Sequence, residues 1–76
     1  MRYSVWASDA GYKNYRAGKN GWQVLLDGEI VERVFTADTD LGEVVRSKVD
    51  ADGRLVREGD EFATETLRGT VEVRPL

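Results

Sequence analysis

Hydrophobic and polar residues alternate in several short runs along the chain, which is the pattern of half-buried β-strands. The clearest pair of runs is Trp22–Leu26 and Glu29–Phe35, and the dipeptide Asp27-Gly28 separates them. Asp-Gly tolerates the positive φ angles of a type I′ turn, and β-branched residues flank it here. The pattern therefore predicts a two-residue β-hairpin.

Shorter alternating runs lie near both ends of the sequence. Tyr3–Ala7 predicts a first strand that carries Trp6 on its second face. Thr70–Arg74 predicts a last strand, which ends at Pro75 because proline has no N–H to donate to a ladder. Between the first strand and the hairpin, Asp9–Gly21 holds three Gly and two Asn without an apolar period. This segment is therefore expected to be a long loop.

Residues 39–48 fit two structures. Asp40 followed by Glu43 is a capping-box spacing typical of a helix start. Gly42 and the adjacent Val44 and Val45 favour a strand, because glycine weakens a first helical turn and β-branched residues pack well in sheets. We favour the strand.

A strand at this place would make Asp50–Gly53 the turn of a second hairpin, which returns through Arg54–Val56. Glu58-Gly59-Asp60 predicts a further turn. Residues 60–68 fit a short helix ended by Gly69 as well as they fit a strand, and this choice stays open.

These elements predict a mainly β, or small α+β, fold. It would be an antiparallel sheet or a partly open barrel of five or six strands, with room for one short helix. A chain of 76 residues can bury only one small core. Residues 1–76 are therefore expected to form a single domain.

The composition limits which covalent links, metal ligands and membrane segments the chain can have. The chain has no Cys and no His, which removes disulfides and thiolate or imidazole metal ligands. No apolar run is long enough for a signal peptide or a membrane span. We expect a cytoplasmic protein of a bacterial host cell, with no cofactor, no metal and no membrane partner.

Catalytic patterns are missing too. A serine nucleophile usually needs a histidine base, and the chain has none. Asp50-Ala51-Asp52-Gly53 resembles part of a calcium loop, but Gly59 would stand where that loop needs a bidentate carboxylate. We expect no enzyme.

Charge is segregated along the sequence. Residues 1–22 carry four basic side chains and one acidic, a net charge of +3, whereas residues 23–76 carry a net charge of −6. The basic part interleaves aromatic and basic side chains. These candidate partner-binding residues are Tyr12, Lys13, Tyr15, Arg16 and Lys19. Such a set fits a protein partner, stacked nucleic-acid bases, or simple cover for the end of a sheet, and all three interpretations stay open.

An acidic set lies further along the chain, at Asp38, Asp40 and Glu43. Acidic clusters on a small protein can occupy a basic surface that normally holds nucleic acid. These three residues are therefore a second candidate for partner binding. The alternative is a solvated loop surface.

Residues 26–73 contain a series of short motifs: Asp27–Val31, Ala37-Asp38, Gly42–Val44, Asp52-Gly53 and Thr64–Val73. In these motifs the chain resembles small uncharacterised proteins encoded by phages and prophages. The resemblance implies an accessory protein of a mobile element, such as an inhibitor of host defence, an anti-CRISPR protein among them, or a minor part of the phage particle. It assigns no role to any residue.

The leading hypothesis is a phage-encoded protein-binding module that inhibits a host defence complex, such as a CRISPR–Cas nucleoprotein, by occupying a binding surface. One alternative is a small β module that binds nucleic acid, although the net charge of −3 disfavours direct binding. Another is a structural or assembly protein of the phage that forms a homo-oligomer.

Overall fold

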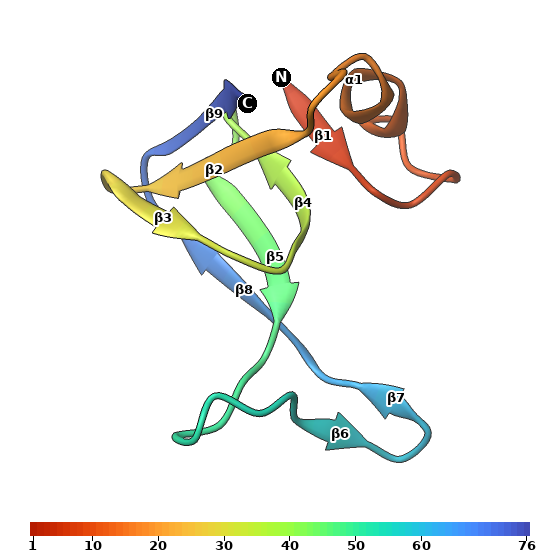
Figure 1. Ribbon diagram of the computed structural model, residues 1–76, viewed down its shortest axis with the longest axis vertical. Coiled ribbons are helices and arrows are strands. Elements are labelled where there is room, and N and C mark those ends of the chain that lie inside the picture. Colours follow the sequence, from red (N-terminus) through yellow and green to blue (C-terminus); the bar gives the residue numbers. More distant parts are fainter.

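The computed structural model describes residues 1–76 and confirms a mainly β fold with antiparallel sheets and one short helix (Figure 1). In chain order the elements are β1 (Arg2–Ser4), α1 (Tyr12–Arg16), β2 (Trp22–Leu26), β3 (Glu29–Val31), β4 (Val34–Asp38), β5 (Glu43–Ser47), β6 (Arg57–Glu58), β7 (Glu61–Phe62), β8 (Thr64–Arg68) and β9 (Val71–Pro75). The first sheet has the strand order β1-β4-β5-β8 and the second has β3-β2-β9, while β6 and β7 pair only with each other.

The hairpin predicted at Asp27-Gly28 is confirmed. Leu26 pairs with Glu29 across the turn, so β2 and β3 are antiparallel neighbours. The φ angles of Asp27 and Gly28 are 52° and 85°, as a type I′ turn requires. Local turn chemistry fixes this register.

The predicted single strand Glu29–Phe35 is wrong, because the chain turns a corner in its middle. Arg33 has a φ of 58°, and there the chain leaves β3 in the second sheet and enters β4 in the first. Such corners and several very short pairings divide the chain into nine strands, where the sequence predicts five or six. The two larger sheets face each other without closing into a barrel.

The core lies between these two sheets. Its buried members are apolar and come from both of them: Val24, Val31 and Val71 from the second sheet, and Ala37 and Val44 from the first. Val44 is fully buried. A chain of this length can bury one contiguous core of this kind.

Both ambiguous segments are extended. Residues 39–48 contain the strand β5, as favoured above, and residues 60–68 contain β7 and β8. Gly42 ends the turn before β5 with a φ of 65°, and a Cβ there would lie 2.5 Å from the carbonyl oxygen of Gly69. Only glycine fits this contact, so a tight turn replaces the helix start.

The loop predicted over Asp9–Gly21 is wrong in part, since it contains α1. The helix has no buried residue, and hydrogen bonds hold it against the outer edge of β1. The Asn14 side chain donates to the carbonyl oxygen of Arg2 at 2.8 Å, and the Ser4 N–H donates to the carbonyl oxygen of Gly11 at 3.1 Å. The helix thereby covers an otherwise open sheet edge.

Residues 48–63 form a hairpin arm that extends from the two sheets (Figure 1). The predicted turn at Asp50–Gly53 is present, with a bridge between Val49 and Leu55. The predicted turn around Gly59 joins β6 to β7, and Gly59 has a φ of 61°. The arm is thus two successive short pairings.

None of the helical segments has the length and apolar character needed to cross a membrane.

Candidate functional site

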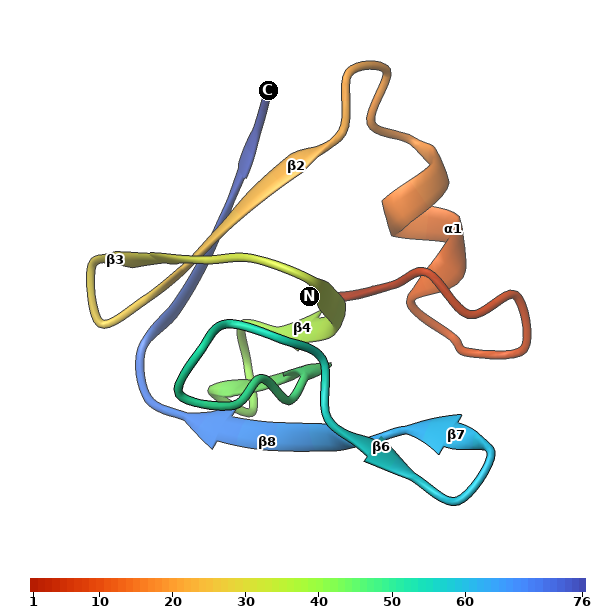
Figure 2. The ribbon, with the colours of Figure 1, turned by 60° about the horizontal axis from the view of Figure 1, so that its bottom comes forward.

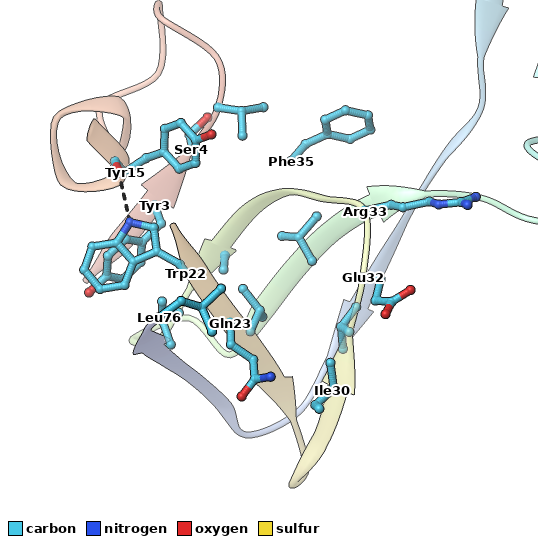
Figure 3. A pocket seen from close by; sticks show the side chains of 16 residues that line it. Tyr3, Ser4, Tyr15, Trp22, Gln23, Ile30, Glu32, Arg33, Phe35 and Leu76 are labelled. Atoms are coloured by element: carbon cyan, nitrogen blue, oxygen red, sulfur yellow. Dashed lines mark hydrogen bonds between the residues drawn. The ribbon is translucent and has the colours of Figure 1, made fainter. Parts of the chain in front are cut away.

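A cavity of about 300 Å³ opens between the two larger sheets (Figure 3). We call it the inter-sheet pocket. Of its 16 lining residues, 12 are hydrophobic. Strands β1 and β4 form one wall, β2 and β3 form the other, and Tyr15 of α1 lies at one end together with Leu76. The volume is at the lower limit of ligand pockets, which span about 300–1,000 Å³.

A β-bulge in β4 shapes the pocket. Val34 pairs with Arg46 and Thr36 pairs with Val45, so Phe35 is the extra residue on the bulged strand. Successive side chains of a regular strand point to opposite faces, yet Val34 and Phe35 both line the pocket. The bulge therefore supplies two neighbouring apolar side chains to the same wall.

Trp22 is a fixed part of the opposite wall. Its ring centroid lies 4.9 Å from that of Tyr3, and its Nε1–H donates to the carbonyl oxygen of Tyr15 at 3.0 Å. Gly18 leaves the room for the indole, because a Cβ there would lie 2.5 Å from Nε1. Trp22 thus connects α1 to the second sheet and keeps one end of the pocket in place.

Apolar side chains stand exposed at the mouth of the pocket. Ile30 and Leu76 are 60% and 62% exposed. Beyond the rim, Trp6 stacks on Phe35 with 5.5 Å between ring centroids and is itself 44% exposed. The apolar surface therefore continues from the pocket to the outside of the protein.

Few polar groups reach this surface. The buried Ser4 hydroxyl accepts a hydrogen bond from the Trp6 N–H at 3.1 Å, while Glu32 and Arg33 are exposed at the rim. No buried side-chain N or O atom lacks a hydrogen-bond partner. No group of three or more Asp or Glu side chains is arranged to hold a metal ion. The pocket can therefore bind a group through complementary shape and apolar contact, with few hydrogen bonds.

The predicted aromatic and basic residues lie on α1 and just after it, and α1 meets the pocket through Tyr15. Four of them lie on α1 and the fifth follows three residues after its end: Tyr12, Lys13, Tyr15, Arg16 and Lys19. Tyr15 alone lines the pocket. The Arg16 side chain donates to the Tyr12 hydroxyl at 3.3 Å. None of the three cations takes part in an ion pair, and no acidic residue lies between positions 12 and 19.

The predicted acidic residues are in large part engaged within the chain. Asp40 is exposed and pairs with the N-terminal ammonium of Met1 at 2.7 Å. Glu43 pairs with Arg68 at 2.9 Å. Asp38 is buried, 7% exposed. The three residues therefore do not form an unpaired acidic face.

Asp38 organises the turn between β4 and β5. Its Oδ1 accepts hydrogen bonds from the N–H groups of Asp40 and Leu41, each at 3.0 Å. These hydrogen bonds hold the pKa of Asp38 below its usual value. The bond from Leu41 has the largest effect, followed by the bond from Asp40 and then by the positive charges of the N-terminus and Arg2. The carboxylate stabilises local structure.

Asp9 anchors the segment that leads into α1. The Arg2 guanidinium donates to both carboxylate oxygens at 2.8 Å, and the Gly11 N–H donates to Oδ1 at 2.8 Å. The bonds from Arg2 contribute most to lowering the pKa of Asp9 to about 2. This contact, which the sequence analysis missed, holds the end of the pocket that α1 forms.

The residues at the pocket mouth, Ile30 and Leu76 above all, are not recognisable as a site from the sequence pattern. Ile30 and Val31 are adjacent apolar residues between Glu29 and Glu32 in a predicted strand, and this pattern does not show which of the two is exposed. Phe35 gave no signal, because a bulge depends on the partner strand.

No protein-family model, no curated protein and no solved structure matches this chain.

Proposed function

We propose that this protein is a non-catalytic binding module, and that the inter-sheet pocket receives an apolar side chain of a protein partner. The observation that carries the proposal is the apolar pocket with exposed Ile30 and Leu76 at its mouth. Transfer of one Val-, Leu- or Phe-sized side chain of the partner from water into the pocket would stabilise the complex by about 1.5–3 kcal/mol. Aromatic walls such as Trp22 and Tyr15 are typical of the anchoring positions of protein interfaces.

The absence of reactive groups from the pocket supports a binding role. The chain has no His and no Cys, and the Ser4 hydroxyl already accepts a hydrogen bond. The walls present packed side chains and the rim presents one acidic and one basic residue, Glu32 and Arg33. An apolar centre with a polar rim is the usual anatomy of a protein interface.

For the partner we propose a host defence complex, and most specifically a CRISPR–Cas nucleoprotein. The resemblance of residues 26–73 to phage accessory proteins supports this assignment. Inhibition would be steric, since the module would occupy a surface that the complex needs. The pairing of Asp40 and Glu43 inside the chain favours the pocket and α1, ahead of the acidic set, as the contacting surface.

The test is the plating efficiency of a phage on a host whose CRISPR–Cas system targets it. We expect the wild-type protein, made from a plasmid, to raise plating and Ile30→Asp to abolish the effect. Leu41→Asp is the matched control, because Leu41 is 67% exposed and lies outside the pocket. Equal loss with both variants, or no protection by the wild type, would contradict the proposal.

A second candidate is direct nucleic-acid binding by α1. The unpaired Lys13, Arg16 and Lys19 beside two tyrosines favour it, because cations follow a phosphate backbone and aromatic rings stack on bases. Tryptophan fluorescence with mixed-sequence DNA and RNA at low salt tests it. Binding that weakens with salt and with Tyr15→Ala would support this candidate, and no binding would exclude it.

A further inference from the structure

The hairpin arm carries apolar side chains that its own chain does not cover. Phe62 and Leu55 are 53% and 38% exposed. The β6–β7 pairing is two residues long on each strand and belongs to neither large sheet. A two-stranded hairpin alone is marginally stable in water, so the tip of the arm would gain stability from an apolar partner.

The tip is also acidic. Residues 57–62 hold Glu58, Asp60 and Glu61 against the single Arg57, a net charge of −2. None of the three carboxylates takes part in an ion pair. Arg57 lies 5.3 Å from the centroid of the Phe62 ring. The tip therefore presents an aromatic side chain, with one guanidinium over its ring, on a segment of net negative charge.

The inter-sheet pocket is the chemical complement of this tip. Its lining is apolar and its volume of about 300 Å³ accommodates an aromatic ring. Residues 12–19, of which Tyr15 lines the pocket, carry a net charge of +3 without an ion pair. Figure 1 and Figure 2 show α1 apart from the β6–β7 tip, and no residue of the arm lines the pocket of its own chain.

We propose that the hairpin arm of one copy of this chain docks into the inter-sheet pocket of a second copy. Phe62 would enter the pocket, and the acidic residues of the tip would face Lys13, Arg16 and Lys19. This inference rests on the proposed function, in which the pocket binds an apolar side chain of a polypeptide, and it adds a second copy of this chain to the host complex as an occupant of that pocket. Since the arm and the pocket are different surfaces, the contact is head-to-tail, and each added copy offers a new arm or a new pocket.

The first experiment measures molar mass against protein concentration by analytical ultracentrifugation, up to about 1 mM. We expect the mass of the wild type to rise with concentration. Ile30→Asp places a negative charge at the apolar mouth of the pocket, and Phe62→Asp removes the aromatic ring that would enter it. Each variant alone should therefore stay monomeric. Both side chains are more than half exposed, and circular dichroism checks that each variant is folded.

Mixing the two variants gives the decisive result. Ile30→Asp keeps an intact arm and Phe62→Asp keeps an intact pocket, so an equimolar mixture should form a 1:1 dimer and stop there. Leu41→Asp, exposed but outside both surfaces, should associate like the wild type. Association of either variant alone, or no dimer in the mixture while the wild type associates, would overturn the arm-in-pocket contact.

Charge reversal tests the proposed attraction between the acidic tip of the arm and the basic residues of positions 12–19. Lys13→Glu with Arg16→Glu should weaken association at least about tenfold at low salt, and a copy with Glu58→Lys and Glu61→Lys in its arm should restore it. A lack of rescue would count against the proposed orientation. A wild type that stays monomeric would overturn the inference, whereas protection of the phage that Ile30→Asp abolishes would still support the proposed function.

Discussion

Asp27 and Thr70 are hydrogen-bonded to each other in both directions. The Asp27 N–H donates to the carbonyl oxygen of Thr70 at 2.9 Å, and the Thr70 N–H donates to Asp27 Oδ1 at 2.9 Å. The two residues join the β2–β3 turn to the corner between β8 and β9. Because that corner connects the two large sheets, this pair helps to set the angle between them.

Substitutions at Asp27 should separate backbone strain from the side-chain bond. Asp27→Asn keeps both the acceptor and a residue that tolerates positive φ, so the free energy of unfolding should change by less than about 0.5 kcal/mol. Asp27→Gly loses the acceptor alone and should cost about 0.5–1.5 kcal/mol. Asp27→Ala loses the acceptor and adds about 1–2 kcal/mol of strain. Urea denaturation measures all three, and an alanine variant as stable as the glycine variant would refute the strain.

Acid should destabilise the fold through Asp9. Its pKa is about 2 in the folded protein against an ordinary value of 3.8, so the unfolded chain binds the proton more tightly. The stabilisation is therefore complete above pH 3.8 and is lost as the pH falls towards about 2. Denaturation of Asp9→Asn across this range should show a flatter pH dependence than the wild type. Asp52→Asn, at an exposed turn residue, is the matched control for the loss of one carboxylate.

Asp38 and Asp40 should differ in their effect on stability. Asp38→Ala leaves the N–H groups of Asp40 and Leu41 without their acceptor and should cost about 1–3 kcal/mol. Asp40→Ala removes an exposed ion pair and should cost less than about 1 kcal/mol. Thermal denaturation checks the difference. If Asp38→Ala instead left stability unchanged and weakened partner binding, the acidic set would regain its predicted role as a contact surface.

Gly18 should be required for the position of Trp22. A methyl group at Gly18 would meet the indole at 2.5 Å, so Gly18→Ala should displace the ring and cost about 1–3 kcal/mol. The displaced indole loses its bond to the carbonyl oxygen of Tyr15, and its fluorescence emission should shift to longer wavelength. In a Trp22→Leu background the same change should cost less, which a double-mutant cycle measures. Equal costs in both backgrounds would show that the indole is not the obstacle.

Local chemistry made part of the fold predictable. Asp27-Gly28 determines a type I′ hairpin within four residues, and the turn at Gly59 needs no distant contact either. The valines at positions 44 and 45 together with Gly42 were enough to favour a strand over a helix. The aromatic and basic residues of positions 12–19 were recognised as a set because they are neighbours in sequence.

Tertiary contacts decided the rest. The corner at Arg33 and the bulge at Phe35 arise where a strand must leave one sheet and pair in the other, and no short window of sequence carries that requirement. The helix α1 is held against the edge of β1 by contacts distant in sequence, such as the hydrogen bond from Asn14 to the carbonyl oxygen of Arg2. The sequence by itself determined the hairpin at Asp27-Gly28, the turns at Asp50–Gly53 and Gly59, and a strand within residues 39–48. The packing of two sheets across a bulge created the pocket, because only that packing brings Phe35, Ile30 and Trp22 around one space.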